Sequence, residues 1–268
     1  MADGRHARAW AAISSRARDE DATPSLRHAC LACMDASRAS GVAVSVSGRT
    51  ATLHEGLFMT DARIAEMEEL QATLGEGPGI EALHGPWPVL APDLAADSIL
   101  ARWPMLAPEA TRRGFGAMFA FPIQAGAVRL GVLGIYRDVA GTLDDDSLAD
   151  ALVYADIALQ LALGEGAAAS DGNGDSGPEP PTGWNAGIHQ ATGMASVQLG
   201  VSMTDALARL RAEAFARDLL LAEVAAGIVS RRFAFPPDSE VGRLHPPRDN
   251  DPTGSAGCGD PREDERDP

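Results

Sequence analysis

The sequence predicts an α+β domain followed by a small all-helical module. Residues 25–163 switch between helical and strand-like hydrophobic periods in the order helix, hairpin, helices, hairpin, helix. Strands that come as hairpins predict an antiparallel sheet with helices packed against it. Residues 184–235 carry only helical periodicity. Between the two, residues 164–183 contain no large apolar side chain. Such a segment cannot offset its ordering entropy by burial, which predicts a flexible linker.

Each element of the α+β domain has its own signal. Residues 1–24 are expected to form a helical extension, and Thr23-Pro24 opens the next helix because proline is favoured in the first helical turn. Gly and Pro separate the later segments. The expected elements begin with a helix ending at Gly41, strands 42–48 and 50–54 around a turn at Ser47-Gly48-Arg49, and a helix capped by Thr60. A turn at 74–79 leads into a short helix, followed by a strand at 87–90 and an irregular helical stretch over 99–112. The last elements are strands 117–123 and 129–136 and a helix from Leu143 to Leu163.

Three helices are expected in residues 184–235. The first runs from Trp184 to Leu199 and is ended by Gly200, and the third runs from Leu219 to Phe233. Ser202 supplies a polar cap for the helix between them. Three short helices in about fifty residues suffice for a small bundle. Residues 236–268 are rich in Pro, Gly, Asp and Arg, which predicts a disordered acidic tail.

Composition narrows the class of protein. No apolar run reaches the ~18–20 residues that a membrane helix needs, and the N-terminus lacks the apolar core of a signal peptide. We therefore expect a cytoplasmic protein with no membrane partner. Cys30 and Cys33 fall on one expected helix and Cys258 in the tail, which fits neither a disulfide framework nor a four-ligand zinc site. No Ser-His-Asp order, metal pair or phosphate loop stands out, so we expect no enzyme.

Charge is unevenly distributed along the chain. The net charge is −16, which is unfavourable for binding a polyanion. Residues 1–163 carry 13 Arg and 21 acidic residues, a charge of −8. Residues 184–235 carry five Arg and four acidic residues, a charge of +1. The helical module is thus the part of the chain whose charge permits nucleic-acid binding.

Residues 25–163 contain a series of short motifs in a fixed order: Leu74-Gly-Glu-Gly-Pro78, Asp93-Leu94, Trp103-Pro104, Gly114, Phe119-Ala-Phe-Pro-Ile-Gln-Ala-Gly126 and Arg129-Leu-Gly-Val-Leu-Gly-Ile-Tyr-Arg137. With these motifs the segment resembles a GAF domain, a small-molecule sensor fold. Relatives often have Cys where this chain has Gly79, so sensing through that thiol does not apply here. The resemblance implies a small-molecule ligand without fixing its identity, and the cofactor stays unknown. His54 and His84 are the candidate haem-type ligands, although a lone His is more often hydrogen-bonded or solvated.

Residues 184–235 contain a second ordered series of motifs: Ile188-His-Gln-Ala-Thr-Gly-Met194, Gln198-Leu-Gly-Val-Ser202, Asp205-Ala206, Leu210-Arg211, Ala214-Phe215 and Leu221-Ala-Glu-Val-Ala225. With these motifs the segment resembles an ANTAR domain, a three-helix RNA-binding module whose members act in transcription antitermination. GAF followed by ANTAR is a familiar pairing. The two resemblances together imply an actinobacterial-type regulator that senses a signal and binds RNA hairpins to control transcription termination.

The resemblance implies an RNA surface on the helical module. Small residues would let a base or phosphate approach the helix closely, and Arg side chains would supply charge and planar stacking. The candidate RNA-binding residues are Gln190, Ala191, Gly193, Arg209, Arg211, Arg231 and Arg232. The competing interpretation is that Ala191 and Gly193 allow close helix packing and that the Arg side chains are solvated.

Two other functions stay open at this point. The second and third helices of the module are a possible helix-turn-helix for duplex DNA, but the third is mostly apolar and acidic, a poor surface for the major groove. Alternatively, the module docks a protein partner through an apolar face. A homodimer, formed through helices at 148–163 or 26–34, would present two modules to two RNA loops. Because a Gly/Pro linker is no rigid helix, we expect the sensor to act by masking the module or by changing its effective concentration.

Overall fold

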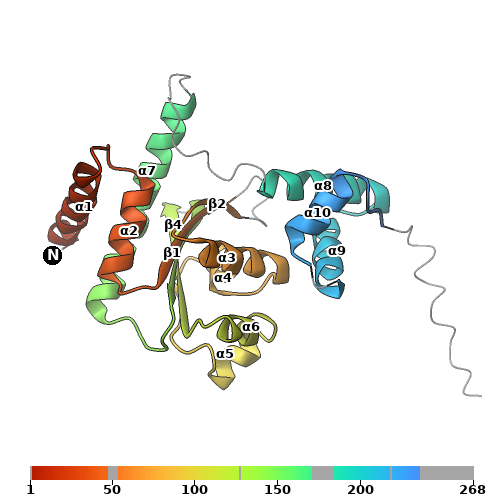
Figure 1. Ribbon diagram of the computed structural model, residues 1–268, viewed down its shortest axis with the longest axis horizontal. Helices are drawn as coiled ribbons and strands as arrows, with labels where there is room; N and C mark the ends of the chain where they lie inside the picture. The colour runs from red at the N-terminus through yellow and green to blue at the C-terminus, as the bar shows by residue number, and fades with distance from the viewer. Residues whose placement is uncertain (1, 48–53, 127, 171–183, 218, 236–268) are drawn as a thin grey trace, which may run out of the picture. The chain divides into compact units, whose positions relative to one another are not determined.

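The computed structural model describes residues 2–47, 54–126, 128–170, 184–217 and 219–235 (Figure 1). Most of the turn predicted at 47–49 lies outside these residues. Five antiparallel strands form one sheet in the order β2-β1-β5-β4-β3. The strands are β1 (Gly41–Ser47), β2 (His54–Met59), β3 (Val89–Ala91), β4 (Ala117–Ala125) and β5 (Val128–Arg137). The predicted α+β class with an antiparallel sheet is confirmed.

Helices cover both faces of this sheet, and we call residues 2–170 the sheet region. Its helices are α1 (Ala2–Asp19), α2 (Leu26–Ala36), α3 (Ala62–Leu74), α4 (Pro78–His84), α5 (Asp97–Arg102), α6 (Leu106–Arg112) and α7 (Asp145–Ser170). Helices α1, α2 and α7 pack with one another over one face, and α3, α5 and α6 enclose a second core on the other. Pro104 separates α5 from α6, as expected for a residue that cannot continue a helix.

Strand residues alternate between the two cores. In β4, Phe119 and Phe121 join the core under α2 and α7, whereas Met118 joins the core under α3. In β5, Ile135 faces the first core and Tyr136 the second. Because successive side chains of a strand point to opposite faces, two covered faces require apolar residues at every position. That requirement explains why β4 and β5 are continuous apolar runs.

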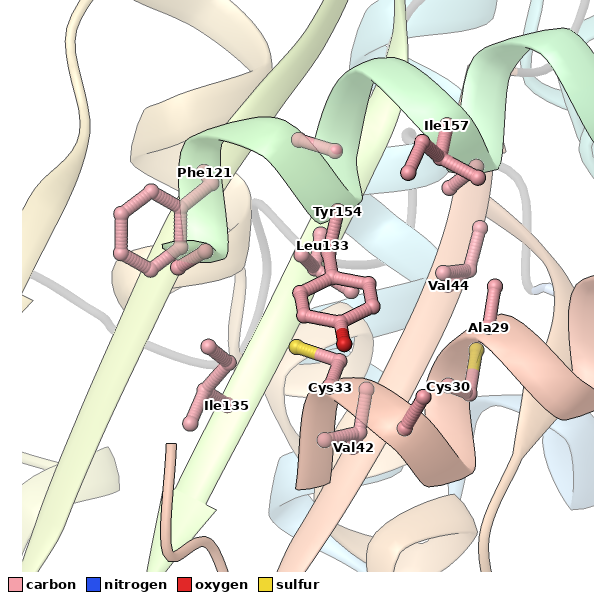
Figure 2. Close-up of a cluster of buried hydrophobic side chains, with 14 of the residues drawn as sticks. Ala29, Cys30, Cys33, Val42, Val44, Phe121, Leu133, Ile135, Tyr154 and Ile157 are labelled. Atoms are coloured by element: carbon pink, nitrogen blue, oxygen red, sulfur yellow. The ribbon is translucent and has the colours of Figure 1, made fainter. Parts of the chain in front are cut away.

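The two cysteines of α2 lie inside the first core. Figure 2 shows Cys30 and Cys33 pointing from α2 toward the sheet, with the Tyr154 side chain of α7 directed toward Cys33. Both side chains are buried, and neither cysteine forms a disulfide within the described chain. Burial raises the pKa of Cys33 to about 12. The thiol is therefore protonated at neutral pH and is a packing group rather than a nucleophile, as its position on a core-facing helix predicts.

A chain of hydrogen bonds runs through the second core. The Gly79 amide donates to Gln71 Oε1 at 3.0 Å, and Gln71 Nε2 donates to the Tyr136 hydroxyl at 3.0 Å. The Tyr136 hydroxyl in turn donates to the Glu68 carboxyl group. All three side chains are buried, and burial raises the pKa of Glu68. A fixed polar network of this kind holds α3 in one register against β5 and α4.

Three further helices pack around a separate core, and we call residues 184–235 the three-helix module. The helices are α8 (Trp184–Leu199), α9 (Met203–Ala216) and α10 (Leu221–Val229). Their buried residues include Ile188, Leu210 and Ile228. Ser202 caps α9, because its hydroxyl accepts a hydrogen bond from the Asp205 amide at 3.1 Å. The sheet region and this module both belong to one compact unit, Met1–Phe235.

Several predicted boundaries are wrong. Strand β2 begins at His54, where the sequence predicted it to end, and the residues between it and Ser47 lie outside the described chain. Thr60 does not cap α3, since its hydroxyl accepts from the Val42 amide and Asp61 is the cap instead. Helix α10 ends at Val229 rather than Phe233, because the next residues fold back onto its last carbonyls.

The predicted linker is also shorter than the sequence indicated. Helix α7 continues past Leu163 to Ser170, so the first seven residues of the predicted linker 164–183 are helical. Three successive alanines, which have the highest helix propensity, follow Gly166 and extend a helix that is already formed. The rest of that linker, 171–183, and the predicted tail 236–268 lie outside the described residues.

Helix α7 is apolar enough over Asp145–Gly164 to span a bilayer by length and composition. Its core-facing side chains nevertheless include Ala151, Tyr154 and Ile157, which pack against the sheet and α2. These side chains account for part of the apolar character, since 33% of the stretch is buried and other apolar residues of it, such as Leu152 and Leu163, are exposed. No apolar run of this length was expected from the sequence.

The buried carboxyl group of Glu68 makes stability depend on pH. Because its pKa is raised in the folded state, the folded chain holds a proton that the unfolded chain releases above its ordinary pKa of about 4.3. Stability should therefore fall as the pH rises from that value through the folded pKa. We expect Glu68→Gln, which keeps an acceptor for Tyr136, to leave the melting temperature unchanged near pH 4 and to raise it near pH 7. A melting-temperature difference that is the same at both pH values would contradict this assignment.

Candidate nucleic-acid interface

The candidate interface is a groove on the three-helix module, between α8 and the segment that follows α10. It encloses about 720 Å³. Three of the seven predicted RNA-binding residues line it: Gln190, Gly193 and Arg231. The remaining lining residues are Met194, Val197, Gln198, Ile228, Phe233 and Ala234. The groove therefore combines apolar walls with two amide side chains and one guanidinium, groups that bind both the flat faces and the polar edges of bases.

The end of α10 places Arg231 in this groove. Ser230 caps the helix, and Arg231 then adopts the left-handed conformation, with a φ of 56°. The Arg232 and Phe233 amides both fold back onto the Gly227 carbonyl, at 2.9 and 3.1 Å. This reversal closes the helix and directs the following residues along its side, toward α8. Since a non-glycine residue at positive φ is uncommon, the surrounding contacts must hold Arg231 there.

Phe233 is an aromatic residue of the groove that the sequence did not single out. Its ring packs against Phe235, with centroids 5.1 Å apart, and the Arg217 guanidinium lies 4.4 Å from its centroid. Both phenylalanines follow the end of α10, which the sequence predicted to run as far as Phe233. The signal that could have pointed to them is Arg231-Arg-Phe-Ala-Phe235, a pair of basic residues followed closely by two aromatics.

Gly193 has no packing function within the described chain. A Cβ built at this position would meet no heavy atom within 4 Å. Glycine in a helix interior is less stable than alanine by ~0.5–1 kcal/mol, so intrachain packing does not account for it. Ala191 is the opposite case: it is fully buried in the module core, and helix packing explains its small size.

The four predicted arginines lie in different places. Arg231 and Arg232 are exposed beyond α10, and Arg232 Nε donates to the Ser230 hydroxyl at 2.9 Å. Arg209 and Arg211 are two residues apart on α9, so they point about 200° apart around the helix axis. Arg209 is exposed, whereas Arg211 is partly buried against the sheet region. Of the four, Arg231 is the one that lines the groove.

The candidate haem ligands of the sheet region receive no support. His84 is exposed and its Nδ1 lies 2.7 Å from the Ile80 carbonyl, a local contact within α4. The side chain of His54 lies outside the described residues. Within the part of the chain that the structure describes, no group of three or more His, Cys, Asp or Glu side chains is placed to hold a metal ion.

Comparison with known proteins gives matches at the level of solved structures alone. No family model matches the chain, and no curated protein matches it. One similar structure is the GAF domain of a phosphoenolpyruvate-protein phosphotransferase from Coxiella burnetii, with 12% identity and a TM-score of 0.42 over 62% of this chain and 98% of that one. The GAF domain of the phosphoenolpyruvate-protein phosphotransferase from Acinetobacter has 10% identity and a TM-score of 0.42 over 62% of this chain and 97% of that one. Another is an N-acylhomoserine lactone-dependent LuxR-family transcription factor from Burkholderia cenocepacia (16%, 0.44, 61% and 99%).

Two of these three neighbours are GAF domains, the family that residues 25–163 resemble in sequence. All three have TM-scores below 0.5 and identities below 25%.

The open space around Gly193 predicts how substitution affects stability. We expect Gly193→Ala to stabilise the folded chain by ~0.5–1 kcal/mol, because alanine restricts the unfolded chain and meets no neighbour in α8. Gly187→Ala is the matched control, since this glycine of α8 also meets nothing within 4 Å and lies outside the groove lining. Urea unfolding monitored by circular dichroism measures both. Destabilisation by Gly193→Ala alone would mean that the groove wall needs glycine for the fold.

Proposed function

We propose that this chain is a cytoplasmic, non-enzymatic regulator in which a GAF-like domain senses a small molecule or state and an ANTAR-like module binds RNA hairpins to control transcription termination. One observation carries the RNA part of the proposal. Gln190, Gly193 and Arg231, selected by the sequence resemblance, come from two separate segments and line a single groove. The glycine among them has no packing function among the residues that the structure describes.

The groove has the properties that a single-stranded RNA loop requires. An unstacked base needs an apolar or aromatic surface and nearby hydrogen-bonding groups, which Phe233, Gln190 and Gln198 supply. A flanking phosphate needs a cation, which Arg231 supplies. Duplex DNA is a poorer fit, because the helix that would enter a major groove, α10, has an apolar sequence and buries Leu221, Val224 and Ile228 in the module core.

A protein partner is the second candidate. Val197 is 84% exposed at the groove, and Phe215 on α9 is 57% exposed. Exposed apolar side chains of this size favour a docking surface. They do not by themselves explain a groove with a guanidinium and an open glycine, so we place RNA first. Within the proposal, the chain is a homodimer that presents two modules, and the sensor ligand is a small molecule of unknown identity.

Binding to RNA hairpins tests the proposed function directly. We expect the full chain to bind a fluorescently labelled pool of hairpins with randomised loops in preference to duplex DNA of matched length, measured by anisotropy across a salt series. Arg231→Ala should weaken binding and reduce the slope of log affinity against log salt concentration by about 0.7–0.9, the value of one lost phosphate contact. The control Arg8→Ala, an exposed arginine of α1, should leave the slope unchanged.

The glycine pair supplies an independent test of the same groove. Gly193→Ala should weaken hairpin binding although it stabilises the fold, whereas Gly187→Ala should stabilise without changing binding. Equal hairpin affinity of both variants would remove Gly193 from the interface. Preference of the native chain for duplex DNA would favour a transcription factor of the DNA-binding type.

A further inference from the structure

The three-helix module contacts the sheet region through the C-terminal end of α3. Arg211 Nε of α9 donates to the Ala72 carbonyl at 2.9 Å, and the Leu221 amide of α10 donates to the Thr73 hydroxyl at 3.1 Å. Figure 1 shows α9 and α10 lying beside α3. We call these two hydrogen bonds, which join segments about 140 residues apart in sequence, the docking contact.

Each hydrogen bond of the docking contact satisfies a helix terminus. The last four carbonyls of a helix and its first four amides have no partner within the helix. Ala72 lies in the last turn of α3, and Leu221 is the first residue of α10. Arg211 therefore caps the C-terminus of α3, where the helix dipole favours a cation, and Thr73 caps the N-terminus of α10. Since Thr73 is buried, loss of either hydrogen-bond partner leaves the other as a buried polar group that neither protein nor water satisfies.

The geometry of α3 leaves room for the Arg211 guanidinium. Gly75 ends the helix in the left-handed conformation, with a φ of 68°. A Cβ at Gly75 would lie 3.3 Å from Arg211 Nη1, tighter than ordinary contact. The guanidinium thus lies over the C-terminal glycine, and its withdrawal from water lowers the pKa of Arg211. In this arrangement the side chain is directed at the sheet region and away from any ligand of the module.

Helix α8 also adjoins β2, and the two parts leave a space between them near α3. A cavity of about 490 Å³ lies beside the docking contact. Its apolar lining comes from both sides: Leu70, Leu74, Met105, Phe215, Leu219 and Leu220. Charged side chains, among them Glu66, Arg113 and Glu223, complete the lining, so water has access to the cavity and the apolar side chains are incompletely withdrawn from solvent. The hydrogen bonds at α3 therefore contribute a larger share of the docking.

We propose that the docking contact withholds Arg211 from RNA, so that docking onto α3 lowers the affinity of the module for hairpins. The inference rests on the proposed function. A guanidinium that caps α3 cannot also contact a phosphate or stack on a base. By linkage, whatever releases the module from α3 raises its affinity for RNA, and RNA in turn favours the released module.

The sensor core has a direct connection to this contact. Gln71 immediately precedes Ala72 and Thr73 on α3, and its side chain bridges the Gly79 amide and the Tyr136 hydroxyl inside the core. A ligand that displaces Gln71 or α4 therefore moves the carbonyl and hydroxyl groups that hold the module. No continuous helix between the two parts is needed for such a signal.

Removal of the Thr73 hydroxyl should release the module. In the full chain, Thr73→Val leaves the Leu221 amide without its acceptor, and we expect hydrogen exchange at the first turn of α10 to accelerate about tenfold, the factor that corresponds to ~1.4 kcal/mol. Affinity for the labelled hairpin pool should rise by a similar factor. Thr111→Val is the matched control, because this threonine of α6 donates to the Ala107 carbonyl, outside the docking contact. It should change neither readout.

A disulfide that locks the module onto α3 tests the opposite case, in which docking is made permanent. Thr73 and Leu220 line the same cavity, so Thr73→Cys with Leu220→Cys, in a Cys258→Ser background, should form a disulfide that holds the module docked. Oxidation should lower hairpin affinity at least tenfold, and a reductant should restore it. Equal hairpin affinity of the native, Thr73→Val and oxidised forms would overturn docking control while leaving the proposed function intact. Absence of hairpin binding in every form, reduced or oxidised, would instead reject the proposed function and this inference with it.

Discussion

Burial of the sheet on both faces is the constraint on which the rest of the structure depends. Each strand of the sheet centre must carry apolar residues toward two cores at once, and enough helix must be present to cover both. Helices α1, α2 and α7 meet that demand on one face. The other face is covered by α3, α4, α5 and α6, and the core on that side contains buried polar side chains. The buried network of Glu68, Gln71 and Tyr136 lies on that side.

A buried polar network fixes α3 more closely than apolar packing would. Apolar side chains tolerate small shifts, whereas a hydrogen bond weakens steeply with distance and angle. Gln71 links α3 to the start of α4 through Gly79 and to β5 through Tyr136. The next two residues of the same helix, Ala72 and Thr73, accept the hydrogen bonds that hold the three-helix module. Helix α3 is therefore the element through which a change in the core reaches the module.

The sequence predicted the fold better than it predicted the element ends. Strong apolar runs located β4 and β5, because burial on both faces gives them a continuous pattern. The edge strand β2 was misplaced, since an edge position and a bulge in β1 leave little periodicity to detect. Helix α7 extends into a segment that looked like a linker, because helix propagation from a packed helix depends on local propensity and not on burial.

The candidate site was predictable in part and for identifiable reasons. Gln190, Gly193 and Arg231 were found from the family pattern, but nothing in that pattern shows that α10 ends early and turns Arg231 back toward α8. Ala191 is explained by packing, a distinction that depends on knowing which face of α8 is buried. The contact of the Arg211 side chain with α3 could not be predicted from the sequence, because it joins residues 139 positions apart.

Charge gives docking a second consequence for RNA binding. The module carries +1, whereas residues 1–163 carry −8. A docked module presents its groove to RNA while joined to a strongly acidic neighbour, and Arg211, one of its five arginines, is turned toward that neighbour. Repulsion between the acidic sheet region and phosphates acts over about a Debye length, ~8 Å at physiological salt. Release of the module removes this repulsion and returns one cation to its surface, so both effects favour RNA in the released form. High salt screens the repulsion but also weakens phosphate contacts, and the competition between docking and RNA should therefore be strongest at low ionic strength.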